Sequence, residues 1–515
     1  MRTWVLAIVA TMASLWADAD AAEWVQAESE NFVFYGEVAP EKAQDTIREL
    51  EIFRSTILTL RGLDAATPEV RKVHVFGARN ERGVQKLTGM GGIAGVYTTG
   101  DDYPVFVTTV GSKRRRDDGA HMVMLHEFSH HVVHTHTAQF YPRWLDEGMA
   151  EYFASFTVDG DTVTVGEPAS MHALILSRPG WTDEEVVFNA VAEYPFEGGT
   201  YREGLRAGYF YGISWLAVHY LMSTPELGMR IDDYVALINE GAAPREAFER
   251  GFGLTQKAFQ RRIWQYWQKN KFPMVQFKLG EQLTDPAVAV RAIPEAEARI
   301  ALFEAEVRFR QDPKDRDRTR RDIEAMMAAG PPSAALFSHL SALAMRQDDL
   351  GEAVMIGQRA VEALPDDPLA IQTLADALFH QAMKTRGPQR RERLNEAFAL
   401  FSRQLAIEPT SPTANIHLPT AALQGGIAPN QTVVNAVAFN LSHKRSPSNF
   451  FVYLDGAEVM DRVGAADEKC ALLEVVGPWI RAADAALDDE ARAKRRGETP
   501  LGRLERLDEG TCAAR

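Results

Sequence analysis

The spacing of apolar and polar residues changes repeatedly over the first part of the chain, between the alternation typical of strands and the longer period of helices. The stretch WVQAESENFVFYGE, residues 24–37, has the aromatic and apolar content of a strand. Residues 40–60 repeat their apolar positions at helical spacing. Further strands are expected over 73–76, 95–97 and 103–110, with a helical stretch up to Leu87. These patterns predict a mixed α+β region.

Helices dominate the middle of the chain. The patterns predict one helix over 119–133 and a second over 142–155. The sequence TVDGDTVTVG then predicts a hairpin within 156–166, because Asp-Gly is a favoured two-residue turn. The pattern is helical again over 182–272.

The composition changes once more after this region, where 276–294 is predicted to be a linker. Beyond it the chain is rich in Ala and Leu at helical spacing, and two similar helix starts, at Pro332 and Pro368, stand 36 residues apart. This separation resembles the period of tetratricopeptide repeats, which is about 34 residues. We therefore predict tetratricopeptide-like helical hairpins over 295–425, with an irregular helical bundle as the alternative, and further helices over 426–515. The expected fold class is an α+β domain followed by an all-α helical-hairpin region.

Charge narrows the classes of partner. The 515-residue chain has a formal net charge of −15, and phosphate binding needs a basic surface, so nucleic acid is not an expected partner. The basic run 113–116 is followed directly by two aspartates, which is typical of a solvated loop.

The N-terminus has the pattern of an export signal. Arg2 provides positive charge, an apolar stretch follows, and small residues around Ala21 resemble a cleavage site. We predict a signal peptide over 1–21, with an uncleaved membrane anchor as the alternative. No later stretch is apolar enough to span a membrane, so the mature protein is expected outside the cytoplasm, in a bacterial periplasm. An oxidising compartment would permit a disulfide between Cys470 and Cys512, but the sequence does not determine whether they meet.

The strongest chemical signal is the sequence HEFSH, residues 126–130. His126 and His130 are four residues apart, so they lie on one face of the predicted helix. Two imidazoles in this arrangement can bind one Zn²⁺, with Glu127 beside them. A catalytic zinc site also needs a third protein ligand and a position left open for water.

Two residues are candidates for the third ligand. His136 has the spacing of the metzincin pattern HExxHxxGxxH, but Val133 stands where that pattern needs a glycine to break the helix. Glu147 lies seventeen residues after His130, within the sequence WLDEGMAEY.

The pair HEFSH and WLDEGMAEY resembles the gluzincin metallopeptidases, and in particular the peptidase MA-like group of exported bacterial proteins. The resemblance implies a zincin-like catalytic domain over 22–275. It also implies that His126, His130 and Glu147 hold Zn²⁺.

The same resemblance implies roles for neighbouring residues. Glu127 would be the general base that activates water, and later the acid that protonates the leaving amine. Glu151, one turn beyond the ligand glutamate, would accept a hydrogen bond from a ligand histidine and fix its orientation. The segment GYFYGISW resembles the family's Y-x-x-S-W sequence, so Tyr211, with Tyr209 as the alternative, would stabilise the oxyanion.

Other residues near these motifs lead to different expectations. His131 and His134 are expected to be structural or solvated, because four protein ligands would close a zinc site to water. Asp146 projects from another face of its helix and is not expected to be a ligand. The strand over 103–109 is expected to be a sheet edge that pairs with an extended peptide, with an interior strand as the alternative.

These patterns predict an exported zinc-dependent metallopeptidase that hydrolyses peptide bonds. Its substrate would be a peptide or protein, and the helical repeats would recognise a substrate or a protein partner. The sequence contains no match to the G-x-M-E-N segment of gluzincin aminopeptidases, which favours endopeptidase activity. The alternatives are a non-catalytic envelope scaffold that retains the fold and a zinc amidase that acts on a non-peptide substrate.

Overall fold

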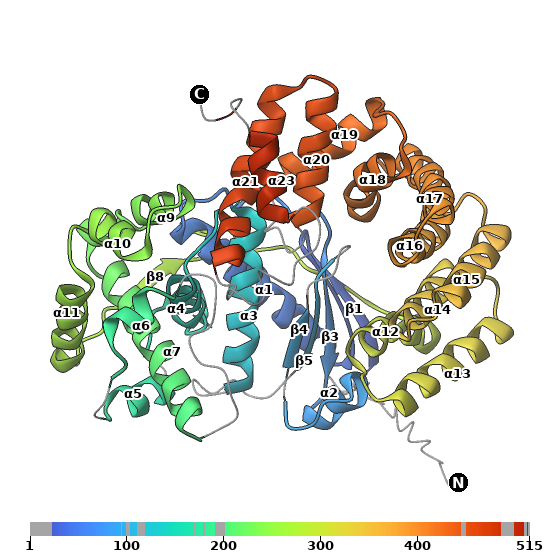
Figure 1. The fold of residues 1–515 in the computed structure, drawn as a ribbon. Helices are drawn as coiled ribbons and strands as arrows, with labels where there is room; N and C mark the ends of the chain where they lie inside the picture. The colour runs from blue at the N-terminus through green and yellow to red at the C-terminus, as the bar shows by residue number, and fades with distance from the viewer. Residues whose placement is uncertain are drawn as a thin grey trace, which may run out of the picture.

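The computed structural model places a sheet-containing N-terminal half beside a long series of helices (Figure 1). It describes residues 23–93, 95–98, 103–110, 119–137, 139–168, 170–178, 181–190, 201–443, 450–485, 499–508 and 512. The predicted signal peptide, residues 1–21, and the basic run 113–116 lie outside the described residues. Within the described residues, no helix combines the length and the apolar character that a membrane crossing requires.

A six-stranded sheet forms the centre of the N-terminal half. Its strands are β1 (Glu23–Glu28), β2 (Phe32–Val38), β3 (Val73–Ala78), β4 (Gly95–Thr98), β5 (Val105–Thr109) and β9 (Ala289–Ala292). They lie in the order β4-β5-β3-β2-β1-β9. The central strands β2, β3 and β5 are parallel to one another, whereas β1, β4 and β9 each pair antiparallel with a neighbour.

The segment 24–37 forms two strands rather than the single strand predicted. The backbone N–H of Ser29 donates to the carbonyl of Phe32 at 3.0 Å, and the Ser29 hydroxyl accepts from the N–H of Phe32 at 3.2 Å. These bonds close a tight turn, so β1 and β2 fold back on each other as an antiparallel pair. The polar Ser-Glu-Asn triplet is the sequence signal of this turn, and the prediction of one strand overlooked it.

Helices cover both faces of the sheet. They are α1 (Pro40–Leu60) and α3 (Gly119–His136) on one face, and α2 (Glu81–Thr88) and α12 (Glu295–Phe309) on the other. Phe128 of α3 packs against Phe32 and Phe106 of the sheet, with ring centroids 5.4 and 5.3 Å apart. α12 is the first helix of the C-terminal region. The N-terminal and C-terminal halves therefore pack against each other at this second face of the sheet.

The segment 276–294 is not a free linker, and this prediction needs correction. β8 (Val275–Lys278) extends the hairpin of β6 (Thr157–Asp159) and β7 (Thr162–Val165) into a three-stranded sheet. β9 then joins the main sheet beside β1. Hydrogen bonds to strands far away in the sequence stabilise this extended chain, and no local pattern of apolar residues reveals them.

The rest of the N-terminal half is helical. Its helices are α4 (Arg143–Phe153), α5 (Ser170–Leu176), α6 (Glu184–Phe188), α7 (Tyr201–Met222), α8 (Pro225–Gly228), α9 (Ile231–Asn239), α10 (Pro244–Phe252) and α11 (Gln256–Lys269). α4 lies very close to α7 at Gly148. A Cβ at this position would overlap the backbone oxygen of Ser214 and lie 2.7 Å from a methyl group of Val218. Glycine therefore permits the close approach of the two helices.

The substitution Gly148→Ala is expected to destabilise the protein by about 1–3 kcal/mol, the usual effect of overpacking a core. The higher helix propensity of Ala offsets at most about 1 kcal/mol of this loss. Gly204→Ala on the exposed start of α7 is the matched control, because a Cβ there meets no atom within 4 Å, and it should stabilise the protein. Chemical denaturation of both variants measures the difference. Equal stabilities would show that the contact between α4 and α7 is looser than described.

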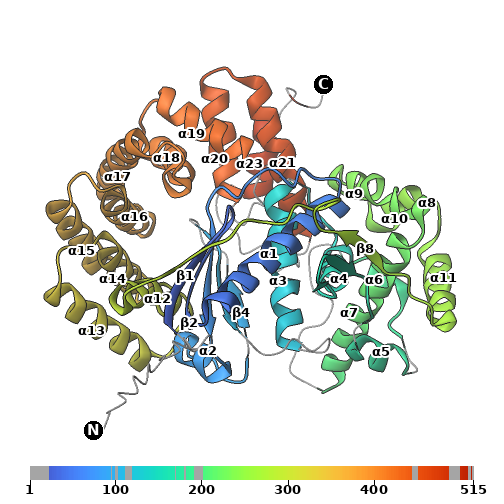
Figure 2. The same cartoon turned by 180° about the vertical axis from the view of Figure 1, so that it is seen from behind.

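The C-terminal region consists of helical hairpins. Its first seven helices are α12, α13 (Pro313–Ala329), α14 (Ala334–Arg346), α15 (Leu350–Ala363), α16 (Pro368–Lys384), α17 (Pro388–Ile407) and α18 (Pro412–Gly425). Each helix packs on the next, and α12, α14, α16 and α18 also pack on one another as one layer. Figure 2 shows the arc that these hairpins form beside the sheet. The predicted series of helical hairpins is therefore confirmed.

The last helices return to the N-terminal half. They are α19 (Gln431–Ser442), α20 (Phe450–Arg462), α21 (Ala466–Ala485) and α23 (Pro500–Asp508). α21 and α23 lie above α3 in both views (Figures 1 and 2). A disulfide between Cys470 of α21 and Cys512 closes this end of the chain.

Candidate metal centre

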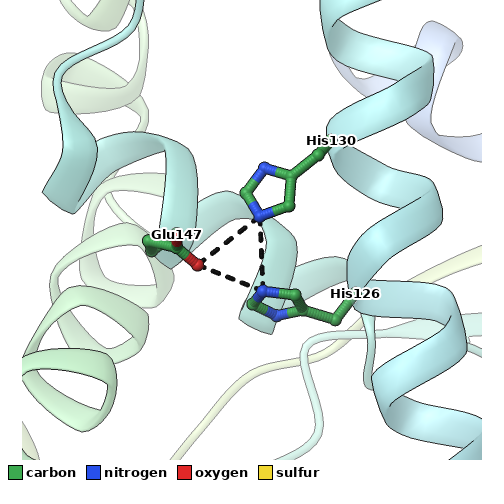
Figure 3. A group of neighbouring side chains, drawn as sticks. All are labelled: His126, His130 and Glu147. Atoms are coloured by element: carbon green, nitrogen blue, oxygen red, sulfur yellow. Dashed lines mark hydrogen bonds and ion pairs between the residues drawn. The ribbon is translucent and has the colours of Figure 1, made fainter. Parts of the chain in front are cut away.

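Helices α3 and α4 bring three candidate ligands within reach of a single ion (Figure 3). The Nε2 atoms of His126 and His130 are 3.3 Å apart. Oε2 of Glu147 lies 3.1 Å from Nε2 of His126 and 3.4 Å from Nε2 of His130. The three donor atoms thus form a nearly equilateral triangle, and all three residues are those that the sequence motifs indicate.

This triangle fits a tetrahedral zinc ion. At zinc–ligand distances of about 2.0–2.1 Å, neighbouring donors of a tetrahedron lie roughly 3.3 Å apart. Oε1 of Glu147 lies 2.9 Å from the guanidinium of Arg143, whereas its Oε2 is buried and faces only the two imidazoles among the described residues. A buried carboxylate oxygen that faces two imidazole nitrogens is well placed to share a bound cation with them. The donor set and its geometry therefore suit Zn²⁺.

The electrostatics of the site also favour a cation. Burial raises the pKa of Glu147, but hydrogen bonds from His126 and His130 and the charge of Arg143 lower it to about 2. Burial lowers the pKa of His130, but Asp146 and Glu147 together raise it well above its ordinary value. The carboxylates are therefore ionised, and they stabilise positive charge at His130.

α3 and α4 are packed into the core of the N-terminal half, and this packing positions the side chains of His126, His130 and Glu147. Trp144 of α4 is fully buried and donates a hydrogen bond from Nε1 to the hydroxyl of Tyr234 at 3.0 Å. Phe128 anchors α3 to the sheet, and α3 packs directly on α4. The i, i+4 spacing then aligns His126 and His130 along the face of α3 that meets Glu147.

Asp146 contacts a candidate ligand histidine, a position that the sequence prediction overlooked. Its carboxylate is buried and lies 3.3 Å from Nδ1 of His130, on the side of the ring opposite the site. His134 lies 3.1 Å from the same carboxylate. Burial raises the pKa of Asp146, but His134 and His130 lower it well below its ordinary value. In metal centres, an ionised carboxylate at this position orients the ring of a ligand histidine and increases its basicity. The signal in the sequence is that Asp146 precedes Glu147 directly.

The substitution Asp146→Asn is expected to weaken zinc binding by about 10–100-fold, which is typical when a carboxylate behind a ligand histidine is lost. The amide keeps the shape but not the negative charge. Competition with a chromogenic chelator measures the affinity. The exposed Asp232→Asn serves as the control, and an Asp146→Asn protein with the same affinity as the control would contradict the role.

Glu151 supports the other histidine. Its Oε1 lies 3.4 Å from Nδ1 of His126, and its Oε2 lies 3.0 Å from Nε2 of His172. Burial raises the pKa of Glu151, but His172 and His126 lower it below its ordinary value. The ring of His172 is in turn stacked on Trp215, with centroids 5.3 Å apart. The prediction for Glu151 named either histidine, and the structure places it behind His126.

His136 belongs to a different cluster. Its Nε2 lies 2.9 Å from Glu69 and 3.0 Å from the guanidinium of Arg54, at the end of α3 remote from Glu147. His131 faces the same carboxylate, at 3.5 Å. Burial raises the pKa of Glu69, but His131 and His136 lower it well below its ordinary value. The alternative in which His136 is the third ligand is therefore wrong.

Glu127 and Tyr211 are the two further residues that the sequence assigned to the chemistry of this site. Glu127 follows His126 on α3 and is partly exposed. The ring of Tyr211 lies edge-on to His126, with centroids 6.1 Å apart. Tyr209 is buried in the hydrophobic core of the N-terminal half. The structure thus places Tyr211 beside a candidate ligand, as the sequence prediction preferred.

The strand over 103–109 is not a sheet edge. β5 lies between β3 and β4, so the interior alternative is correct, and β4 is the edge strand on this side. β4 runs beside α3. The pKa of its Tyr97 is raised well above the ordinary value by burial and by the charges of Glu69 and Glu127.

Comparison with known proteins adds little. No family model matches the chain, and no curated protein matches it. Among solved structures, a thermophilic TPR protein of Thermus thermophilus is similar at 13% identity and a TM-score of 0.28, over 37% of this chain and 98% of that chain. A TM-score this low carries no argument, so the arrangement of the helical hairpins rests on the packing described above.

Proposed function

We propose that this chain is a zinc-dependent metallopeptidase of the gluzincin type. The observation that supports it is the triangle of donor atoms from His126, His130 and Glu147, with sides of 3.1 to 3.4 Å. Glu127 follows His126 directly on α3, and hydrolysis by an activated water would require its carboxylate to reach the water on the metal. A structural zinc site would use a fourth protein ligand.

The proposed chemistry assigns a task to each residue of the site. Bound zinc would lower the pKa of a water molecule toward about 7. Glu127 would accept a proton from this water and deliver it to the leaving amine. Tyr211 would donate a hydrogen bond to the carbonyl oxygen as negative charge develops on it. Asp146 and Glu151 would keep the two imidazoles in the ligating orientation.

The substrate would be an extended peptide segment. β4 is the edge strand next to α3, and an unpaired strand edge can add a peptide by backbone hydrogen bonds. A peptide that pairs with β4 would run beside α3, the helix that carries Glu127. This placement supports cleavage within a chain, in agreement with the endopeptidase activity expected from the sequence.

The helical region would recognise a protein partner or part of the substrate. A cavity of about 820 Å³ lies between the sheet and the layer of helices α12, α14, α16 and α18. His74 and Tyr103 line it from the sheet side, and Glu304, His339 and His417 line it from the helices. Stacked helical hairpins provide extended concave surfaces of this kind for binding.

The proposed place of action is outside the cytoplasm. The export-signal pattern over 1–21 supports this proposal. The disulfide between Cys470 and Cys512 also supports it, because structural disulfides persist mainly in oxidising compartments.

Removal of the metal tests the function. The purified protein is expected to contain zinc and to hydrolyse casein, and a chelator should abolish this hydrolysis. Added Zn²⁺ should restore it, whereas Mg²⁺ should not, because imidazole ligands favour zinc. A protein that binds zinc but cleaves no peptide would instead support the scaffold or the amidase that acts on a non-peptide substrate. A protein that binds no zinc would refute the proposed function.

A further inference from the structure

The C-terminal helix α21 reaches the helix that carries the two candidate ligand histidines. The ring of Trp479 lies 5.7 Å from the ring of His134 and 5.0 Å from the ring of Phe140, both edge to face. More than 300 residues separate these partners in the sequence. Trp479 packs against the core of the N-terminal half, while Ile480 beside it belongs to the core of the helical region. α21 is therefore the point at which the arc of helices closes on the metal centre.

Hydrogen bonds hold the segments on both sides of the contact between Trp479 and Phe140. Arg481 donates a hydrogen bond to the carbonyl of Asn239 at 3.1 Å. The side chain of Asn239 exchanges hydrogen bonds of 3.0 and 2.9 Å with the backbone of Phe140, in the segment that joins α3 to α4. The surface on which Trp479 rests is therefore well defined.

A short series of contacts leads from Trp479 to a candidate zinc ligand. Trp479 packs on the ring of His134, and Nε2 of His134 lies 3.1 Å from the carboxylate of Asp146. Oδ1 of Asp146 lies 3.3 Å from Nδ1 of His130. His134 is partly exposed, so its orientation depends on the side chains that cover it.

We propose that Trp479 is a positioning residue of the metal centre: it holds His134 against Asp146, which in turn orients His130 toward the metal. The inference rests on the proposed function, because it concerns the affinity of the same site for zinc. It assigns the C-terminal helices to the catalytic unit. A ligand of the helical arc that displaces α21 would consequently change the affinity for zinc.

The zinc affinity of the full-length protein tests this proposal. Trp479→Ala is expected to weaken binding about 10-fold, toward the low end of the effect of losing a partner of a ligand histidine. Trp479→Phe retains an aromatic face and should keep most of the affinity. Trp264→Ala, which removes an exposed tryptophan of α11, should bind zinc like the unchanged protein. Competition with a chromogenic chelator gives the affinity, and circular dichroism confirms the fold of each variant. If Trp479→Ala does not fold, Trp479→Leu takes its place.

A double substitution separates positioning from general loss of stability. If Trp479 acts through His134, Trp479→Ala should cause no further loss of affinity in a His134→Ala protein. A full additional loss in that protein would overturn the proposal, and so would a folded Trp479→Ala protein with unchanged affinity. A wild-type protein that binds no zinc would refute the proposed function as well. Normal wild-type binding that His126→Ala abolishes and Trp479→Ala leaves intact would refute the positioning role alone.

Discussion

Replacing Glu127 by glutamine is expected to lower the rate of peptide hydrolysis by about 10²–10⁴-fold, while the zinc content stays unchanged. The magnitude is that of general acid–base catalysis by one side chain. The amide has the size of the carboxylate but cannot accept a proton from water. Glu127 is not one of the three residues whose donor atoms form the triangle, so its loss should not release the metal.

The experiment compares hydrolysis of casein and zinc content in the same preparations. Glu246→Gln on the exposed surface of α10 makes the same chemical change away from the site and should leave both quantities unaltered. Full activity in Glu127→Gln would exclude Glu127 as the base. An activity loss that accompanies loss of zinc would mean that Glu127 supports binding of the metal rather than proton transfer.

Replacing Glu147 by alanine is expected to weaken zinc binding by more than about 100-fold, beyond the effect of losing a partner behind a ligand. The substitution removes the only carboxylate oxygen that faces both His126 and His130 in the described structure. Two imidazoles remain, which are too few for a catalytic zinc site. Peptide hydrolysis should disappear with the metal.

His136→Ala is the informative comparison for this prediction. Because His136 contacts Glu69 and Arg54, its loss should reduce stability but leave the zinc affinity unchanged. Chelator competition and thermal unfolding, measured on both variants, separate the two effects. If His136→Ala lost the metal and Glu147→Ala kept it, the assignment of the third ligand would be reversed.

The sequence predicted the local elements that carry the site. The helix over 40–60 has the predicted bounds, and the helices around HEFSH and WLDEGMAEY lie where the patterns place them. The turn at Gly160 joins β6 and β7 as the Asp-Gly signal indicates, with Gly160 at a φ of 61°. Such features depend on contacts within a few residues, so the periodicity of the sequence reveals them.

The periodicity of the sequence does not reveal the contacts between distant segments. The chain has two candidates for the third ligand, His136 and Glu147, and it is the packing of α3 on α4 that brings the glutamate beside His126 and His130. The same packing turns Asp146 toward His130, and the pairing of the strands leaves β4, rather than β5, at the edge of the sheet.

The sequence by itself therefore determined the helix with two histidines one turn apart, the glutamate-bearing helix after it and the helical hairpins of the C-terminal region. Only the tertiary structure decided which carboxylate meets the histidines, that residues 275–278 and 289–292 form strands, and that Trp479 packs on His134 of α3. The physical reason is the range of the interactions. Helix spacing and turns follow from bonds between near neighbours, whereas strand pairing and helix packing depend on surfaces that come together only when the whole chain has folded.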